Sequence, residues 1–169
     1  GFDNAVIVDN EIIEFANTRT TTRNAALDIF LKRHPALYDD IENEIDYARQ
    51  KNFWIKKVTD VNVTEKIFKQ MSNTLENGGT FKEWKKDVDN ILSQSGLNLS
   101  EGYLKTVFRT NMNHAYNAGI YMKMDKYKAR YPYYQYCGTL DGREQEHTRE
   151  LNGKIFKIGT PEADKYFPP

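Results

Sequence analysis

Arginine, histidine and carboxylate side chains recur in the second half of the chain in a pattern that could support acid–base chemistry. An arginine can hold an anion such as phosphate, while histidines move protons near neutral pH. The residues that could form such a site are Arg109, Asn113, His114, His147, Glu144, Glu146 and Glu150. Alternatively, Arg109 makes several bonds at once and ties a long helix to the C-terminal part of the chain. We favour this architectural role, because no second motif shows how the histidines would be oriented.

Metal binding is a second candidate chemistry. Zinc accepts sulfur, imidazole and carboxylate ligands, so Cys137 and His147 are the candidates, together with acidic neighbours. Their spacing matches no strong zinc signature, and one cysteine can neither close an intramolecular disulfide nor build a thiolate site. The sequence also has no phosphate-cradling glycine loop, serine nucleophile elbow or HExxH motif. We therefore expect no cofactor to be held by these residues alone.

Nucleic-acid binding is a third candidate, carried by a basic and aromatic stretch. Lys123, Lys126, Lys128 and Arg130 could hold a phosphate backbone while neighbouring tyrosines stack on bases. The alternative, which we favour, is that the tyrosines pack a helix against a small sheet while the lysines face water. Six tyrosines at mixed helical and strand spacing cannot all face one ligand. They are Tyr121, Tyr127, Tyr131, Tyr133, Tyr134 and Tyr136.

Charge and hydropathy argue against two classes of protein, general nucleic-acid coats and membrane-spanning proteins. The 169 residues contain 24 basic and 24 acidic side chains, a balance that argues against a general nucleic-acid coat. The charge is nevertheless segregated: residues 1–62 carry a net −3 and residues 99–132 a net +4. No apolar run approaches the roughly 18 residues of a membrane span, and no secretion signal is apparent. We expect a soluble protein without a membrane span.

Helices are expected to position most of these residues. Ser100 or Asn98 can cap a long central helix, whose neighbouring stripe presents Arg109, Asn113 and Asn117 at steps of four. Its apolar face contains Leu104, Phe108, Met112, Ala115, Gly119 and Met122.

Turn and cap signals bound the other helices. Gly78-Gly79 ends one helix, Thr80 with Glu83 forms a capping box for the next, and Gly96 ends that one. Residues 1–62 favour short helices at Ile12 to Phe15, Ala26 to Leu31 and Leu37 to Ala48. Pro35 is expected in the first turn of the third, directly after His34.

The pattern changes after Pro132. Two short runs with strand propensity, 133–137 and 154–158, are separated by turn residues at Asp141-Gly142 and Asn152-Gly153. From Thr160-Pro161 onward we expect irregular structure. The sequence thus predicts an α+β protein with a helical arm over 1–54, a helical core over 55–132 and a small β-containing subdomain over 133–169.

Two strings in this layout form a recognisable pattern. Residues 109–119 read RTNMNHAYNAG, and residues 141–156 are followed by a closing YFPP at 166–169. The first string resembles the central helix, and the second the C-terminal signature, of the Mu F-like phage minor head, or head-morphogenesis, family. The resemblance covers about residues 55–169. The matching positions are Arg109, Thr110, Asn113, Asn117, Gly119, Asp141, Arg143, His147, Leu151, Asn152, Gly153, Lys154 and Phe156.

The resemblance implies a structural protein of the virion that catalyses no reaction. It would assemble in the bacterial host cytoplasm and bind portal protein, major capsid protein or packaged double-stranded DNA. In the family a histidine, or the second cysteine of a Cys-x-x-Cys variant, stands where this chain has Thr148, and Gln145 occupies the other cysteine position. A zinc site would therefore need further ligands from a longer chain. The alternative function is a phage-delivered effector enzyme, either nuclease-like or transferring a nucleotidyl or ADP-ribosyl group. It would use Arg109, His114, His147 and a nearby glutamate.

Overall fold

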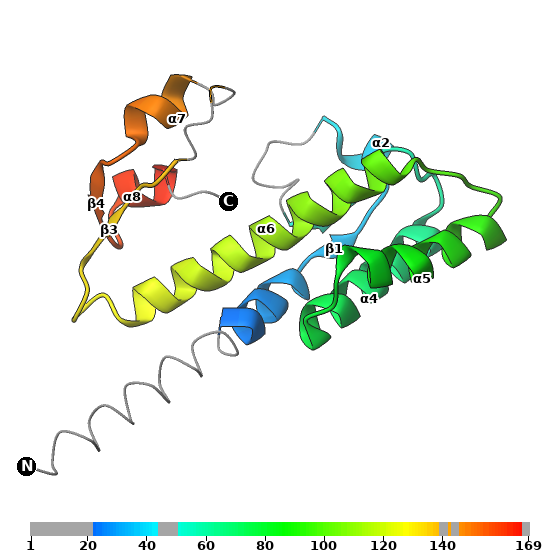
Figure 1. Ribbon diagram of the computed structural model, residues 1–169, viewed down its shortest axis with the longest axis horizontal. Coiled ribbons are helices and arrows are strands. Elements are labelled where there is room, and N and C mark those ends of the chain that lie inside the picture. Colours follow the sequence, from blue (N-terminus) through cyan, green and yellow to red (C-terminus); the bar gives the residue numbers. More distant parts are fainter. Residues whose placement is uncertain (1–21, 44–50, 139–141, 143–145, 167–169) are drawn as a thin grey trace, which may run out of the picture. The chain divides into compact units, whose positions relative to one another are not determined.

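A computed structural model describes residues 22–43, 51–138, 142 and 146–166 of the chain. Two compact units divide the sequence, Gly1–Gly119 and Ile120–Pro169, and each is described by itself. Helices dominate the described residues, and the few strands among them are two or three residues long (Figure 1). This confirms the predicted α+β class. None of the described helices is long and apolar enough to cross a membrane.

The first unit is built mainly from helices. In chain order its described elements are helical residues 22–30, β1 (His34–Pro35), α2 (Tyr38–Ile41), β2 (Asn52–Phe53), α4 (Val61–Asn77), α5 (Phe81–Gln94) and the larger part of α6 (Glu101–Lys126).

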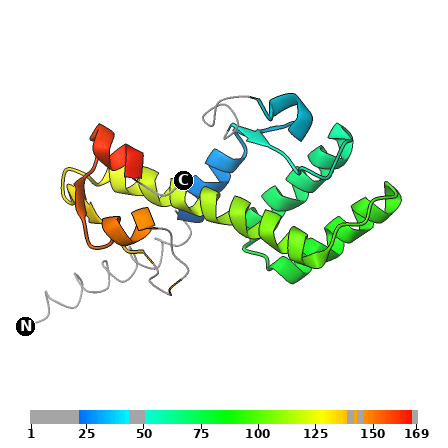
Figure 2. The same ribbon diagram turned by 90° about the horizontal axis from the view of Figure 1, so that it is seen from above.

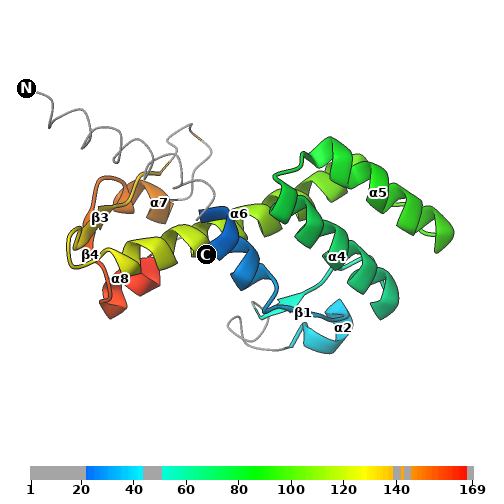
Figure 3. The ribbon, with the colours of Figure 1, turned by 90° about the horizontal axis from the view of Figure 1, so that it is seen from below.

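Local signals end α4 and begin α5, as the sequence predicts. Gly78 follows α4 with a left-handed φ of 71°, which glycine adopts without a steric penalty. The backbone amide of Glu83 donates to Thr80 Oγ1 at 3.4 Å, and the Thr80 amide donates to Glu83 Oε2 at 2.6 Å. This capping box satisfies two amides at the start of α5. Across this short connection α4 and α5 pack side by side (Figure 3).

The core of the first unit is large and aromatic. The Trp84 ring lies 5.3 Å from the ring of Phe108, and the Phe30 ring stacks on Phe68 at 4.9 Å. Full burial of a large apolar side chain contributes about 1.5–3 kcal/mol. The buried residues of this core are Ala26, Phe30, Phe53, Ile55, Val58, Val63, Ile67, Met71, Leu75, Trp84, Val88, Leu92, Leu104, Met112 and Ala115.

Helix α6 buries most of the predicted apolar face within the first unit. Ser100 is its cap, accepting the Tyr103 amide at 3.3 Å. Leu104, Met112, Ala115 and Gly119 are buried and Phe108 is half-buried, as predicted.

The prediction for Met122 is wrong, because this side chain is 46% exposed. Beyond Gly119, α6 continues into the second unit, and its faces no longer follow the core of the first.

Gly119 permits a close helix contact. A Cβ atom there would lie 2.7 Å from the carbonyl oxygen of Thr22 and 2.9 Å from the amide nitrogen of Ala26. Only glycine tolerates such an approach. The helical residues 22–30 consequently pass directly beside α6 (Figure 2).

The chain before α4 departs from prediction at Pro35. This residue is not in the first turn of a helix: with His34 it forms β1, parallel to β2, where Asn52 and Phe53 are the partners. Proline's fixed φ suits both an extended strand and a helix start, so pairing with a distant strand decides between them. Helix α2 begins only at Tyr38. The predicted helical positions Ile12, Ile13, Phe15, Ile45 and Tyr47 lie outside the described residues.

The second unit combines a short ribbon with short helices. Strands β3 and β4 pair in antiparallel fashion, within the two runs predicted to be strands. Two helices were not expected, and the prediction of irregular structure after Thr160 is wrong for residues 161–166. Thr160 begins the second of these helices, since its Oγ1 accepts the Ala163 amide at 3.2 Å. The described elements are β3 (Tyr133–Gln135), α7 (Glu146–Leu151), β4 (Ile155–Lys157) and α8 (Pro161–Tyr166).

Candidate functional site

The central-helix motif presents an exposed polar stripe. Arg109, Thr110 and Asn113 are exposed on α6, whereas Asn117 is half-buried and Gly119 is buried. Within the described part of the chain, the Arg109 side chain makes no hydrogen bond or ion pair. Its expected role as a bridge to the C-terminal part stays a prediction. The stripe exposes the guanidinium of Arg109 and the polar side chains of Thr110 and Asn113 on the surface of α6.

A different arginine makes a long-range bond to α6. Arg33 Nη1 donates to Asn111 Oδ1 at 3.1 Å, across 78 positions of sequence. The Arg33 guanidinium also lies 5.7 Å from the centre of the Phe30 ring. Burial lowers the pKa of Arg33, so the Asn111 bond compensates a charge withdrawn from water. Sequence reasoning missed both residues, although Asn111 lies within the motif of residues 109–119.

His114 is close enough to this arginine to respond to its charge. Burial, and after it the positive charge of Arg33, lowers the pKa of His114. A lowered pKa favours the neutral imidazole. His114 belongs to the first unit, whereas His147 is exposed on α7 of the second. The acid–base hypothesis that joined them receives no support from either unit taken by itself.

The C-terminal motif builds a turn within the second unit. Asn152 Oδ1 accepts the Gly138 amide at 3.0 Å. Gly153 has a φ of 85°, and its amide donates to the Tyr136 carbonyl at 2.8 Å. The turn leads into β4, where Phe156 is buried with Leu151. Asn152, Gly153, Leu151 and Phe156 therefore have architectural roles.

The remaining positions of this motif are exposed or undescribed. His147 and Lys154 are exposed, while Asp141 and Arg143 lie outside the described residues, as do Glu144 and Gln145. Cys137 is an exposed free thiol. Among the side chains that the structure describes, no three of histidine, cysteine, aspartate or glutamate gather into a metal site.

The basic stretch predicted to contact DNA lies on the surface of the second unit. Lys126, Lys128 and Arg130 are exposed and Lys123 is half-buried. Lys128 Nζ lies 2.9 Å from Asp125 Oδ1, which offsets part of its charge. The other exposed cations lie in a region rich in tyrosine.

The tyrosines of this stretch divide between packing and exposure. The Tyr134 hydroxyl donates to the Ala163 carbonyl at 2.8 Å, and the Tyr121 hydroxyl bonds Asp164. Tyr131 and Tyr133 are each 59% exposed. The Arg130 guanidinium lies 5.4 Å from the Tyr131 ring. The packing interpretation therefore holds for Tyr121 and Tyr134. Tyr131 and Tyr133 are instead exposed, as are the neighbouring cations.

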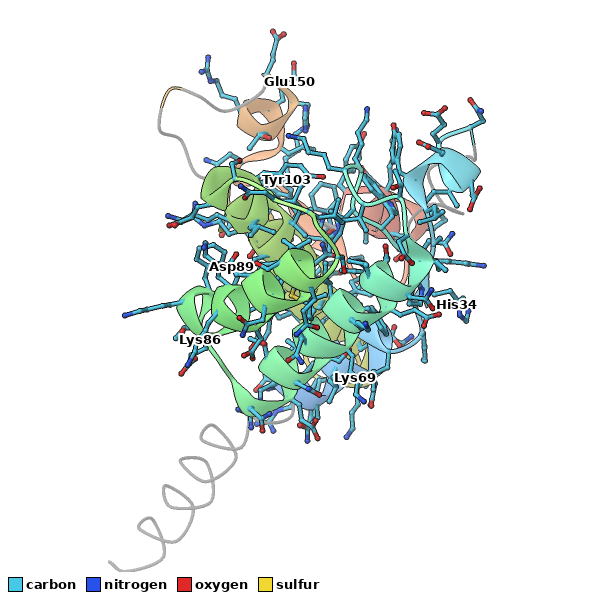
Figure 4. All side chains as sticks on the ribbon, turned by 90° about the vertical axis from the view of Figure 1, so that its right-hand side faces the viewer. His34, Lys69, Lys86, Asp89, Tyr103 and Glu150 are labelled. Carbon is cyan, nitrogen blue, oxygen red and sulfur yellow. The ribbon has the colours of Figure 1, made fainter. Side chains whose placement is uncertain are left out.

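Charge on the first unit has a different character. Side chains of both signs cover the outer faces of α4 and α5, and Figure 4 labels Lys69, Lys86 and Asp89 among them. Lys85 and Asp89 form an ion pair one helical turn apart. Such mixed charge on helices is typical of a solvated surface.

Comparison with known proteins decides the family. A family model described as "Phage Mu protein F like protein" matches residues 65–169, more than half of the chain. The chain belongs to this family. The match to the Mu F-like family includes α6, the turn at Asn152-Gly153 and all of the second unit. It confirms the resemblance carried by the two motif strings.

Two relatives add detail. The "Mu-like prophage FluMu F protein" of Haemophilus influenzae is 25% identical over 139 residues, covering 75% of this chain and 34% of the relative. The "Putative capsid assembly protein F" of Escherichia phage Mu is 24% identical over 139 residues, covering 72% and 32%. The chain thus spans about a third of the length of these Mu F-like relatives. No solved structure matches it.

Proposed function

We propose that this chain is part of a phage head-assembly protein that acts by binding and catalyses no reaction. The observation that carries the proposal is the family match over residues 65–169. It is supported by the Mu relative whose name describes capsid assembly. The protein would assemble in the bacterial host cytoplasm and reside in the phage head. Its partners would be portal or major capsid protein and packaged double-stranded DNA.

The acidic N-terminal part is proposed to dock on the portal or capsid protein. Residues 1–62 carry a net −3 charge. Within them, Asp39 and Asp40 are exposed on α2, and exposed Glu42 follows directly. Clustered carboxylates of this kind steer association with a basic surface.

Neutralising these carboxylates tests the docking proposal. Deleting residues 1–54 would be uninformative, because Ala26, Phe30 and Phe53 belong to the core. The test variant instead combines Asp39→Asn, Asp40→Asn and Glu42→Gln. A matched control removes the same charge from exposed positions on α4 and α5 with Glu65→Gln, Glu76→Gln and Asp87→Asn. Incorporation into purified heads is measured by mass spectrometry.

We expect the test variant to be depleted from heads and the control to be retained. Equal incorporation of both variants would refute docking through α2. Absence of the unaltered chain from virions and from assembly intermediates would refute the head-assembly role itself.

The DNA contact is tested by charge reversal at Lys123, Lys126, Lys128 and Arg130. The matched control reverses four exposed lysines on α4 and α5, namely Lys66, Lys69, Lys82 and Lys86. Each phosphate contact adds about 0.9 to the slope of log affinity against log salt concentration. We expect the first variant to lose both DNA retention at low salt and most of that slope. Unchanged retention would refute the contact.

A further inference from the structure

The β3–β4 ribbon has one buried and one exposed face. Tyr134 opposite Phe156 occupies the buried face, while Tyr133 opposite Lys157 lies on the other. Side chains alternate between the two faces of a strand. Tyr133 is 59% exposed, so its ring is available to a ligand.

The acidic side chains of α8 lie on the opposite side of this ribbon. Tyr134 points toward α8, since its hydroxyl donates to the Ala163 carbonyl at 2.8 Å. Burial, and after it the negative charge of Glu162, raises the pKa of Tyr134. Asp164 bonds the Tyr121 hydroxyl. The ribbon therefore separates these carboxylates from the face that carries Tyr133 and Lys157.

Tyr131 joins the ribbon to the basic turn of residues 127–130, since its amide donates to the Tyr127 carbonyl at 2.9 Å. Tyr131 precedes Pro132, and a residue before proline favours the extended conformation. The Ile158 amide donates to the Pro132 carbonyl at 2.9 Å, which prolongs the ladder to this point. Tyr131 is also 59% exposed, with the Arg130 guanidinium 5.4 Å from its ring.

We infer that Arg130, Tyr131, Tyr133 and Lys157, here called the tyrosine face, bind a single strand of DNA. Two unpaired bases would stack on the tyrosine rings, and the two cations would lie against the phosphates. This deepens the proposed DNA contact and rests on it. A duplex presents phosphates to such a surface, but its interior bases are already stacked on one another. The tyrosine face is thus suited to an unpaired segment or a frayed end.

Binding of the full chain to three fluorescent DNA probes of about 20 nucleotides tests the inference. The probes are oligothymidylate, an abasic strand with the same phosphates, and a blunt-ended duplex. Base–aromatic stacking corresponds to at least about a fivefold gain in affinity per base. We therefore expect oligothymidylate to bind at least fivefold more tightly than the abasic strand, and more tightly than the duplex.

Variants assign this difference to the tyrosine rings. Combined Tyr131→Leu and Tyr133→Leu should bring the affinity for oligothymidylate down to that for the abasic strand. Tyr131→Phe with Tyr133→Phe keeps both rings and should preserve the difference. Ile155→Ala changes a side chain that is 67% exposed on the same ribbon and should also preserve it. Circular dichroism checks that every variant folds like the unaltered chain.

Equal affinity for the abasic strand and oligothymidylate would overturn the inference. So would a leucine variant that still prefers oligothymidylate, or a duplex bound more tightly than the single strand with no effect of the tyrosine variants. That last result would leave the proposed phosphate contacts intact. Loss of the head-assembly role would instead be seen as absence of the chain from heads.

Discussion

The two units of this chain bury their hydrophobic residues to different depths. In the first unit Ile67, Met71 and Leu104 are each 0% exposed and Trp84 is 1% exposed. In the second, Phe156 is 5% exposed and its core neighbours Tyr134, Leu151 and Ile158 retain 6–9%. A small unit has too much surface for its volume to enclose a deep core. The large side chains of the first unit are accordingly more deeply buried than those of the second.

Truncating one core side chain in each unit tests directly whether the difference in burial depth has an energetic consequence. Leu104→Ala leaves a cavity in the deeper core and should reduce the free energy of unfolding by about 2–5 kcal/mol. Phe156→Ala should cost less, because the shallow core around it can collapse or admit water. Urea unfolding measures the loss, and hydrogen exchange shows which amides lose protection.

The pattern of protection distinguishes independent from coupled units. We expect Phe156→Ala to expose amides of β3 and β4 while those of α4 and α5 stay protected. If either substitution reduced amide protection in both units, the two units would unfold together. The difference in burial depth would then produce no difference in their stability.

Two glycines of α6, Gly119 and Gly102, differ in how closely other atoms approach their backbone. Gly119→Ala places a Cβ 2.7 Å from the Thr22 carbonyl oxygen, and overpacking of this kind costs about 1–3 kcal/mol. Gly102→Ala is the matched control, because a Cβ there meets nothing within 4 Å. We expect it to stabilise by up to about 1 kcal/mol through helix propensity. Equal thermal stability of the two variants would contradict the close approach at Gly119.

Asn111 and Asn113 lie two positions apart on α6, but Asn111 is half-buried and bonded to Arg33 whereas Asn113 is exposed. Asn111→Ala leaves the Arg33 guanidinium without its described partner, which should cost about 1–3 kcal/mol. Asn113→Ala alters an exposed side chain and should change stability by less than about 0.5 kcal/mol. Chemical denaturation of both variants measures the difference. Equal costs would show that the Arg33 bond contributes no net stability.

Prediction from sequence succeeded where a feature depends on near neighbours in the chain. The capping box of Thr80 and Glu83, the left-handed Gly78 and the turn at Gly153 all involve residues a few positions apart. Caps and tight turns adopt only a few backbone geometries, and each geometry favours particular residue types, so these residues specify the local structure.

Prediction failed where tertiary contacts decide between local options. Pro35 suits a strand or a helix start, and only its distant partner Phe53 selects the strand. The bond from Arg33 to Asn111 joins residues 78 positions apart, so no local pattern of the sequence indicates it. Helix α7 is too short to show a period. Helix α8 did carry a signal, since Thr160-Pro161 is a cap followed by a proline in the first turn.

The histidine near Arg33, His114, should give the unfolding free energy a weak dependence on pH. Burial and the charge of Arg33 lower the pKa of His114 in the folded chain, whereas in the unfolded chain it is about 6.5. Between these two pKa values the unfolded state binds more protons, so stability rises with pH. The stability associated with the neutral imidazole is therefore present above about pH 6.5 and is lost as the pH falls below this value. His114→Gln should flatten the curve of unfolding free energy against pH in this window. If the unfolding free energy of the variant varied with pH as steeply as that of the unaltered chain, the pKa of His114 would not be lowered in the folded chain.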